Sequence, residues 1–104
     1  MENLKRSVFE QQVLQRVLVG DGAMGTMLYQ QGVFLNRCFD ELNQTDPRMV
    51  RAVHESYVEA GADFIETNTF GANRLKLSKF GLAGEVVPIN RAGVRIARDA
   101  AKDS

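Results

Sequence analysis

Only two stretches of this chain have the character of β-strands, and this limits the folds open to it. They are the apolar run VLVG at residues 17–20 and the run ADFIET at residues 62–67, which is rich in β-branched and aromatic residues. A helical pattern separates them, so the two strands are expected to be parallel. A parallel pair of two strands leaves its edges and its apolar faces uncovered, so it does not make a complete domain.

Helical patterns occupy most of the remaining chain. The clearest follows Asp46, a favoured N-cap residue, and Pro47, which suits the first helical position. Its apolar residues recur at intervals of three and four as far as Gly61, where a helix stop is expected. Together the patterns predict helices over residues 7–16, 23–31, 47–60, 72–80 and 86–102, and a long connection over 32–46 with one helical turn near 39–42.

The order of these elements is that of an α/β fold. A (β/α)₈ barrel, or TIM barrel, takes roughly 250 residues, so about two of its eight units fit into 104 residues. We therefore expect the opening βα units of such a barrel, incomplete in this chain. Residues 1–104 are predicted to be the N-terminal fragment of one barrel domain, with a leading helix in 1–16 and the first two βα units in 17–104.

The charge balance argues against polyanionic partners. Thirteen basic residues balance thirteen acidic ones, so no overall field attracts nucleic acid or an anionic membrane, and neither partner is expected. Four basic residues of the last predicted helix share one face, which is either a DNA-binding stripe or a solvated surface. The neutral balance favours the solvated surface. These residues are Arg91, Arg95, Arg98 and Lys102.

The cysteine content and the absence of long apolar runs indicate a cytoplasmic protein. Cys38 is the single cysteine, so no internal disulfide can form, and a reducing compartment fits best. No segment approaches the roughly 18 consecutive apolar residues of a membrane span. His54, four residues from both Val50 and Val58 on the apolar helix, is expected to be packed or half exposed.

The turn after the first predicted strand, GDGAMG at residues 20–25, matches the dinucleotide-binding fingerprint G-x-G-x-x-G. Such a site needs an acidic residue about 20 positions on, at the end of the next strand. Asp40 and Glu41 have that distance but lie in the irregular connection. Asp21 would also place a carboxylate where backbone amides should receive a pyrophosphate. A dinucleotide-binding module is therefore an alternative that rests on this turn alone.

Polar residues follow both predicted strands. Asp21 comes after the first, and the second ends in Glu66 with Asn68 and Thr69 close behind. Active sites of parallel α/β folds form at the carboxyl ends of the strands, and neighbouring strands lie only about 4.8 Å apart. We expect these groups to face one small ligand. An aspartate suits an ammonium group, whereas asparagine and threonine can donate hydrogen bonds to a carboxylate or an amide.

Four motifs, in order, resemble the N-terminal part of the homocysteine S-methyltransferase family. They are DGAMGT at 21–26, EAGAD at 59–63, ETNTFGAN at 66–73 and INRAGVRIARDAA at 89–101. The resemblance extends from about residue 17 to residue 101. It implies that the chain is the first part of the homocysteine-binding barrel domain, with homocysteine and the remainder of the barrel as its partners.

The resemblance also implies a zinc enzyme. In this family three cysteine thiolates hold a zinc ion, which binds the homocysteine sulfur and lowers its pKa, so that the sulfur attacks a methyl donor and methionine forms. Those cysteines belong to later strands, so the zinc ligands are expected outside this chain, and Cys38 is interpreted as a structural or incidental thiol. The chain alone is expected to be inactive. The methyl donor, folate or another compound, is not identified.

The resemblance assigns substrate contacts but no catalytic residue to this chain. Asp21 and the adjacent Gly22 would contact the amino-acid part of homocysteine, and Asn68 and Thr69 would line the same pocket. Glu66 either binds substrate as well or pairs with a neighbouring basic residue. A noncatalytic fragment that descends from the barrel is the remaining alternative.

Overall fold

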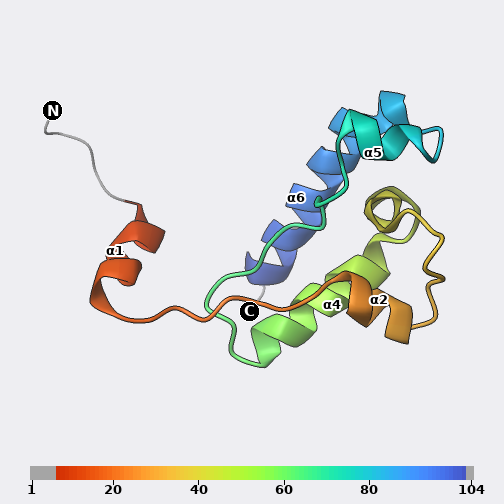
Figure 1. Ribbon diagram of the computed structural model, residues 1–104. Helices are drawn as coiled ribbons and strands as arrows, with labels where there is room; N and C mark the ends of the chain where they lie inside the picture. The colour runs from red at the N-terminus through yellow and green to blue at the C-terminus, as the bar shows by residue number, and fades with distance from the viewer. Residues whose placement is uncertain (1–6, 103–104) are drawn as a thin grey trace, which may run out of the picture.

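The computed structural model describes residues 7–102, and over this range the chain is mostly helical (Figure 1). Every predicted helix is present, with its ends within two residues of the expected positions, and the connection over 32–46 contains two short helices. The predictions for residues 1–6 and 103–104 lie outside the described residues. No helix within 7–102 is long and apolar enough to cross a bilayer.

The elements are α1 (Val8–Gln15), α2 (Gly25–Gln30), the 3₁₀ helix η1 (Phe39–Glu41), α3 (Leu42–Thr45), α4 (Pro47–Glu59), α5 (Arg74–Ser78), the 3₁₀ helix η2 (Ala83–Glu85) and α6 (Val86–Lys102).

The long helices α4 and α6 pack against each other and form the centre of the structure. Asp46 caps α4 by accepting a hydrogen bond from the backbone N–H of Met49, and Pro47 takes the first helical position, as the sequence predicts. Two groups of buried apolar side chains form the core. One contains Leu28, Val50, Val53 and Ile96, and the other contains Cys38, Ala72, Leu77 and Ile89.

The two predicted strands are not formed among the described residues. The prediction of an α/β sheet in this part of the chain is therefore not confirmed. Within residues 7–102 the segments 17–20 and 62–67 are extended, but a single isolated bridge joins them, between Gly20 and Phe64. The bridge is parallel, in agreement with the predicted strand direction. The described chain is therefore a helical structure with two extended segments side by side, and not two complete βα units.

Side-chain carboxylates bind two backbone N–H groups of these segments. The backbone N–H of Asp63 donates to the carbonyl of Val19 at 2.7 Å, as in a ladder. The N–H of Val19, however, donates to the Asp63 carboxylate at 2.8 Å, and the N–H of Glu66 donates to the Asp21 carboxylate at 3.0 Å. These two N–H groups are therefore bonded to side chains and not to a backbone carbonyl of the facing segment.

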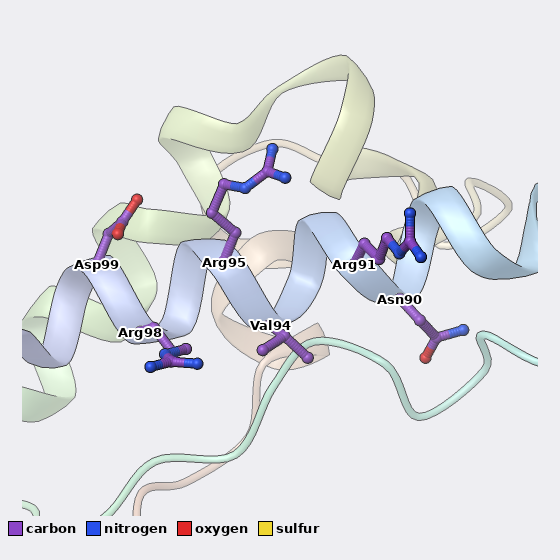
Figure 2. A pocket seen from close by; sticks show the side chains of 6 residues that line it. All are labelled: Asn90, Arg91, Val94, Arg95, Arg98 and Asp99. Atoms are coloured by element: carbon purple, nitrogen blue, oxygen red, sulfur yellow. The ribbon is translucent and has the colours of Figure 1, made fainter.

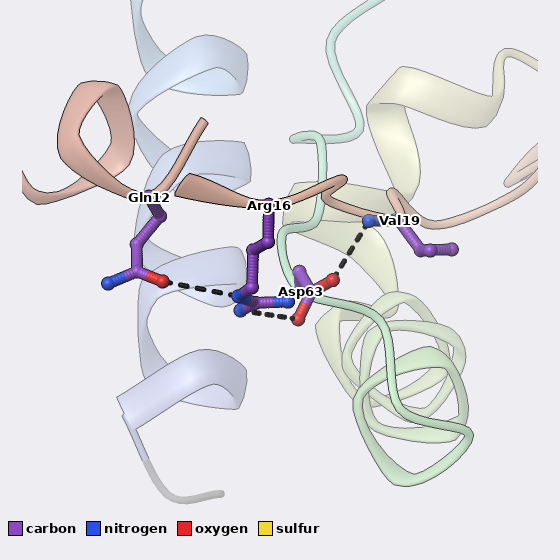
Figure 3. Close-up of polar contacts among 4 residues, drawn as sticks. All are labelled: Gln12, Arg16, Val19 and Asp63. Atoms are coloured by element: carbon purple, nitrogen blue, oxygen red, sulfur yellow. Dashed lines mark hydrogen bonds and ion pairs between the residues drawn. The ribbon is translucent and has the colours of Figure 1, made fainter. Parts of the chain in front are cut away.

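The leading helix α1 stands apart from the rest of the molecule (Figure 1). Ser7 and Glu10 form a capping box at its start, and none of its residues is buried. Its contacts are made near the extended segments: the ring of Phe9 meets Phe64 edge-on at 5.6 Å. Arg16 then pairs with Asp63 at 3.1 Å, next to the bond between Asp63 and Val19 (Figure 3). Asp63 thus links the leading helix to both extended segments.

Candidate functional site

The two extended segments end beside a cavity of about 520 Å³. Its walls come from the glycine-rich turn, from η1 and from the loop that follows the second extended segment. The structure brings all five residues predicted for substrate contact to this cavity, which are Asp21, Gly22, Glu66, Asn68 and Thr69. The remaining lining residues are Ala23, Met24, Gly25, Phe39, Asp40, Thr67, Phe70 and Gly71.

Asp21 joins the two sides of the cavity. Its Oδ2 accepts the hydrogen bond from the backbone N–H of Glu66, so the first turn is fastened to the second extended segment. Its Oδ1 is buried and has no hydrogen-bond partner among residues 7–102. A buried carboxylate oxygen without a donor is costly, so this atom is the least satisfied acceptor of the site.

Gly22 allows the turn to lie directly on helix α4. The hydroxyl of Tyr57, on α4, donates a hydrogen bond to the carbonyl of Ala23 at 2.8 Å. A Cβ atom added at Gly22 would lie 2.8 Å from that same hydroxyl oxygen, closer than a carbon atom can approach without displacement. The glycine therefore lets the turn lie this close to Tyr57, and a larger residue would push the tyrosine hydroxyl aside.

Glu66 is exposed at the rim of the cavity. The sequence left open whether this carboxylate pairs with a basic neighbour, and no residue of 7–102 forms an ion pair with it. Its backbone N–H is engaged with Asp21, but its side chain faces solvent and the cavity mouth. This leaves the carboxylate available to a ligand.

Asn68 is buried, and its amide group is used inside the protein. Its Nδ2 donates to the carbonyl of Phe39 at 2.9 Å and to Oδ1 of Asn43 at 3.0 Å. Asn43 returns a hydrogen bond from its own Nδ2 to the Asn68 carbonyl at 2.8 Å and also contacts the carbonyl of Ile89 at 3.2 Å. Asn68 lines the cavity, but both amide hydrogens hold the loop in place and are not free for a ligand.

Thr69 is half buried next to Thr67, and their hydroxyl oxygens lie 2.6 Å apart in a hydrogen bond. A bonded pair of hydroxyls keeps one hydroxyl hydrogen for another acceptor. The pair therefore retains one hydroxyl donor at the cavity, and Thr67 was not among the predicted contacts.

Asp40 is a cavity residue that the sequence-based prediction missed. It is 9% exposed, and its Oδ2 accepts a hydrogen bond from the backbone N–H of Gly71 at 2.9 Å. Burial raises the pKa of Asp40, and the bond from Gly71 partly opposes this effect. No spacing rule could have paired Asp40 with Gly71, because the contact depends on how the irregular connection folds back across the loop.

The charges lining the cavity are all negative. Asp21, Asp40 and Glu66 contribute carboxyl groups, and no lysine or arginine is among the lining residues. Such a site attracts a cationic group, and it disfavours a pyrophosphate. The glycine turn therefore does not have the electrostatic surroundings of a dinucleotide site.

The described residues do not fit a metal ion. Residues 7–102 contain no group of three histidine, cysteine, aspartate or glutamate side chains placed to hold one. Cys38 is buried, and desolvation raises the pKa of its thiol, so the thiolate that a metal requires is disfavoured. We derive no chemical step through a metal from this chain.

A second hollow, also of about 520 Å³, follows helix α6 (Figure 2). In this view the side chains of Arg95 and Arg98 leave the helix on opposite sides, and Asp99 lies on the side of Arg95. The three arginines nevertheless line this one hollow together, and they share it with the acidic group of Asp99. Its lining residues are Asn90, Arg91, Val94, Arg95, Arg98 and Asp99.

Comparison with known proteins identifies relatives of this chain. The sequence profile of the family described as homocysteine S-methyltransferase matches residues 18–104. Over 95 residues the chain is 41% identical to the methionine synthases of Mycobacterium tuberculosis (strain ATCC 25618 / H37Rv) and Mycobacterium leprae (strain TN). Each alignment covers 86% of this chain but only 8% of the relative, so the chain spans less than a tenth of the length of these curated proteins.

A solved structure shares the fold. The metallated form of the homocysteine methyltransferase MmuM from Escherichia coli matches with a TM-score of 0.78 and 24% sequence identity, over 91% of this chain and 34% of that one. The profile and the methionine synthases carry the family assignment, and they confirm the resemblance that the four sequence motifs indicated. This chain belongs to the homocysteine S-methyltransferase family.

Proposed function

We propose that this chain is the homocysteine-binding part of a methyltransferase that transfers a methyl group to the homocysteine sulfur and produces methionine. In this proposal the amino-acid end of homocysteine occupies the cavity described above. The ammonium group lies against Asp21, with Glu66 at the rim. The Thr67–Thr69 hydroxyl pair and the backbone of the Gly22 turn meet the neighbouring polar atoms of the substrate, while Asn68 holds the loop that carries them.

The observation that carries this proposal is the convergence of three carboxyl groups, with no lysine or arginine in the lining, on the cavity between the DGAMGT and ETNTFGAN motifs. An α-amino acid at neutral pH carries a positive ammonium group, which such a cavity attracts. The same charge distribution opposes the dinucleotide alternative. No contact in the described structure favours that alternative over the amino acid.

We further propose that the segment is completed by the remaining units of a (β/α)₈ barrel. The extended segments expose large apolar side chains where neighbouring strands would cover them: Val17 is 85% exposed and Val19 60%. Phe70 is 91% exposed beside the cavity. Large apolar side chains exposed to this degree support the proposal that another part of the domain covers them.

The metal of the proposed enzyme, zinc, would be bound outside the described residues, because they supply no suitable set of ligands. Within this proposal the chain orients homocysteine and excludes water from its amino-acid end, and it does not activate the sulfur. The segment alone is therefore proposed to be inactive.

The proposal is tested with the substitution Asp21→Asn in a protein that contains this sequence and the rest of the domain. Asparagine keeps the size of the side chain but removes the charge. Since a hydrogen bond to a charged group contributes about 1.5–3 kcal/mol, we expect homocysteine affinity measured by calorimetry to fall roughly tenfold or more. Metal content, measured separately, should be unchanged.

Asp99→Asn is the matched control, because it makes the same chemical change on the exposed surface of α6. It should leave homocysteine affinity unchanged. Full affinity in Asp21→Asn, with the metal retained, would remove the proposed role of this carboxylate.

A further inference from the structure

The least satisfied polar groups of the described chain are an aspartate and a histidine that the proposed function leaves unconnected. His54 is fully buried on helix α4, and neither of its ring nitrogens has a hydrogen-bond partner within residues 7–102. Asp21 Oδ1 is buried and is also without a donor. A neutral imidazole has one N–H donor and one acceptor nitrogen, so it can provide what the carboxylate oxygen lacks.

The packing brings these two residues to the same interface. His54 lies three residues before Tyr57, so both occupy one face of α4. Tyr57 touches the glycine turn directly, through its bond to Ala23 and its contact at Gly22. The face of α4 that carries His54 is therefore the face on which Asp21 and its turn rest.

The electrostatics agree with this placement. Burial lowers the pKa of His54, and the negative charge of Asp21 acts in the opposite direction. Among the described residues, Asp21 is the charged group whose field acts on the imidazole. A lowered pKa favours the neutral form of His54, which carries a single ring N–H.

We propose that His54 is the positioning residue of Asp21: its ring N–H is linked to Asp21 Oδ1 through one buried water molecule, which accepts from the imidazole and donates to the carboxylate. Oδ2 is meanwhile fixed by the N–H of Glu66. With both oxygens held from the protein side, the carboxylate keeps one orientation at the cavity wall. The part of this inference that concerns homocysteine rests on the proposed function, whereas the pairing itself does not.

The pairing can be tested without any substrate. His54 is the only histidine of the 104-residue sequence, so ¹⁵N labelling of histidine gives one imidazole signal, and in a longer protein the His54 signal is the one lost in His54→Gln. We expect a neutral ring with one fixed tautomer. In Asp21→Asn the ¹⁵N shift of the protonated nitrogen should change and the pKa of His54 should fall further. An imidazole spectrum and titration unchanged by Asp21→Asn would overturn the pairing.

A second set of variants separates positioning from simple packing. His54→Gln retains an N–H donor, whereas His54→Leu fills the site without one. If His54 positions Asp21, homocysteine affinity falls roughly tenfold in His54→Leu and is largely preserved in His54→Gln. Equal affinities in the two variants would contradict positioning. If the imidazole responds to Asp21→Asn but homocysteine affinity does not, the pairing stands and the proposed function fails.

Discussion

Asn43 and Asn68 exchange two hydrogen bonds in the interior, one from each side-chain amide, at 2.8 and 3.0 Å. The first goes to a backbone carbonyl and the second to a side-chain oxygen. Asn43 also reaches the carbonyl of Ile89, so a single buried side chain connects α3, the cavity loop and α6. The shape of the loop beneath the cavity depends on this connection.

Asn43→Ala should destabilise the protein considerably. It removes three hydrogen bonds and leaves the Asn68 amide and two backbone carbonyls short of partners in a buried place. Unsatisfied buried groups cost about 1–3 kcal/mol, so we expect the free energy of unfolding to fall by about 2–3 kcal/mol. Urea unfolding followed by circular dichroism measures this change. Asn36→Ala, in the exposed part of the 32–38 connection, is the control and should be nearly neutral.

Gly93→Ala should also destabilise, although alanine favours helices. A Cβ at Gly93, inside α6, would lie 2.8 Å from both Nδ2 of Asn43 and Cγ2 of Thr69. The helix preference contributes about 1 kcal/mol in favour of alanine, but overpacking against the Asn43 bonds costs about 1–3 kcal/mol. We expect a net loss of about 1–2 kcal/mol in urea unfolding. At Gly84 an added Cβ meets nothing within 4 Å, so Gly84→Ala should show no loss, and equal effects at the two positions would refute this explanation.

The helices could be predicted from the sequence because their signals are local. Two helix starts depend on contacts between residues three positions apart: Asp46 accepts a hydrogen bond from the N–H of Met49, and Ser7 forms a capping box with Glu10. Strand pairing is not local. The segments 17–20 and 62–67 have strand composition, but the N–H groups of Val19 and Glu66 bond to side-chain carboxylates, and the pattern of apolar residues contains no information about those bonds.

The candidate site could be predicted only where a residue lies at or just after the end of an extended segment. Asp21, Glu66 and Thr69 lie at the cavity because the two segments run side by side in the same direction. Asp40 and His54 have no such signal: the first reaches the cavity through an irregular connection, and the second lies on an ordinary apolar helix face. The commitment of the Asn68 amide to Asn43 likewise appears only in the folded chain.

The contact of Asp63 with Arg16 and Val19 should make the docking of the leading helix depend on pH. The backbone bond from Val19 and the bond from Arg16 lower the pKa of Asp63 below its ordinary value of 3.8. A carboxyl group whose pKa is lower in the folded state stabilises that state above its unfolded pKa, and this contribution is lost as the pH falls through the folded value. Asp63→Asn should therefore lower the melting temperature at neutral pH, and the difference from the unchanged protein should shrink in strong acid. Thermal melts over a pH series measure it, with Asp99→Asn as the control; a difference independent of pH would contradict the role of the charge.

Cys38 should be protected from thiol reagents in the folded protein. Its side chain is 6% exposed, and desolvation raises the pKa of the thiol, an effect that the neighbouring Asp40 and Glu41 charges reinforce and nearby backbone N–H groups partly oppose. Because the thiolate is the reactive form, both burial and protonation slow alkylation. We expect iodoacetamide to modify the folded chain at least about tenfold more slowly than the urea-unfolded chain, where the same cysteine is exposed. Since Cys38 is the only cysteine of the sequence, mass spectrometry of the whole chain follows this reaction directly, and equal rates in the two states would show that the second apolar cluster does not enclose the thiol.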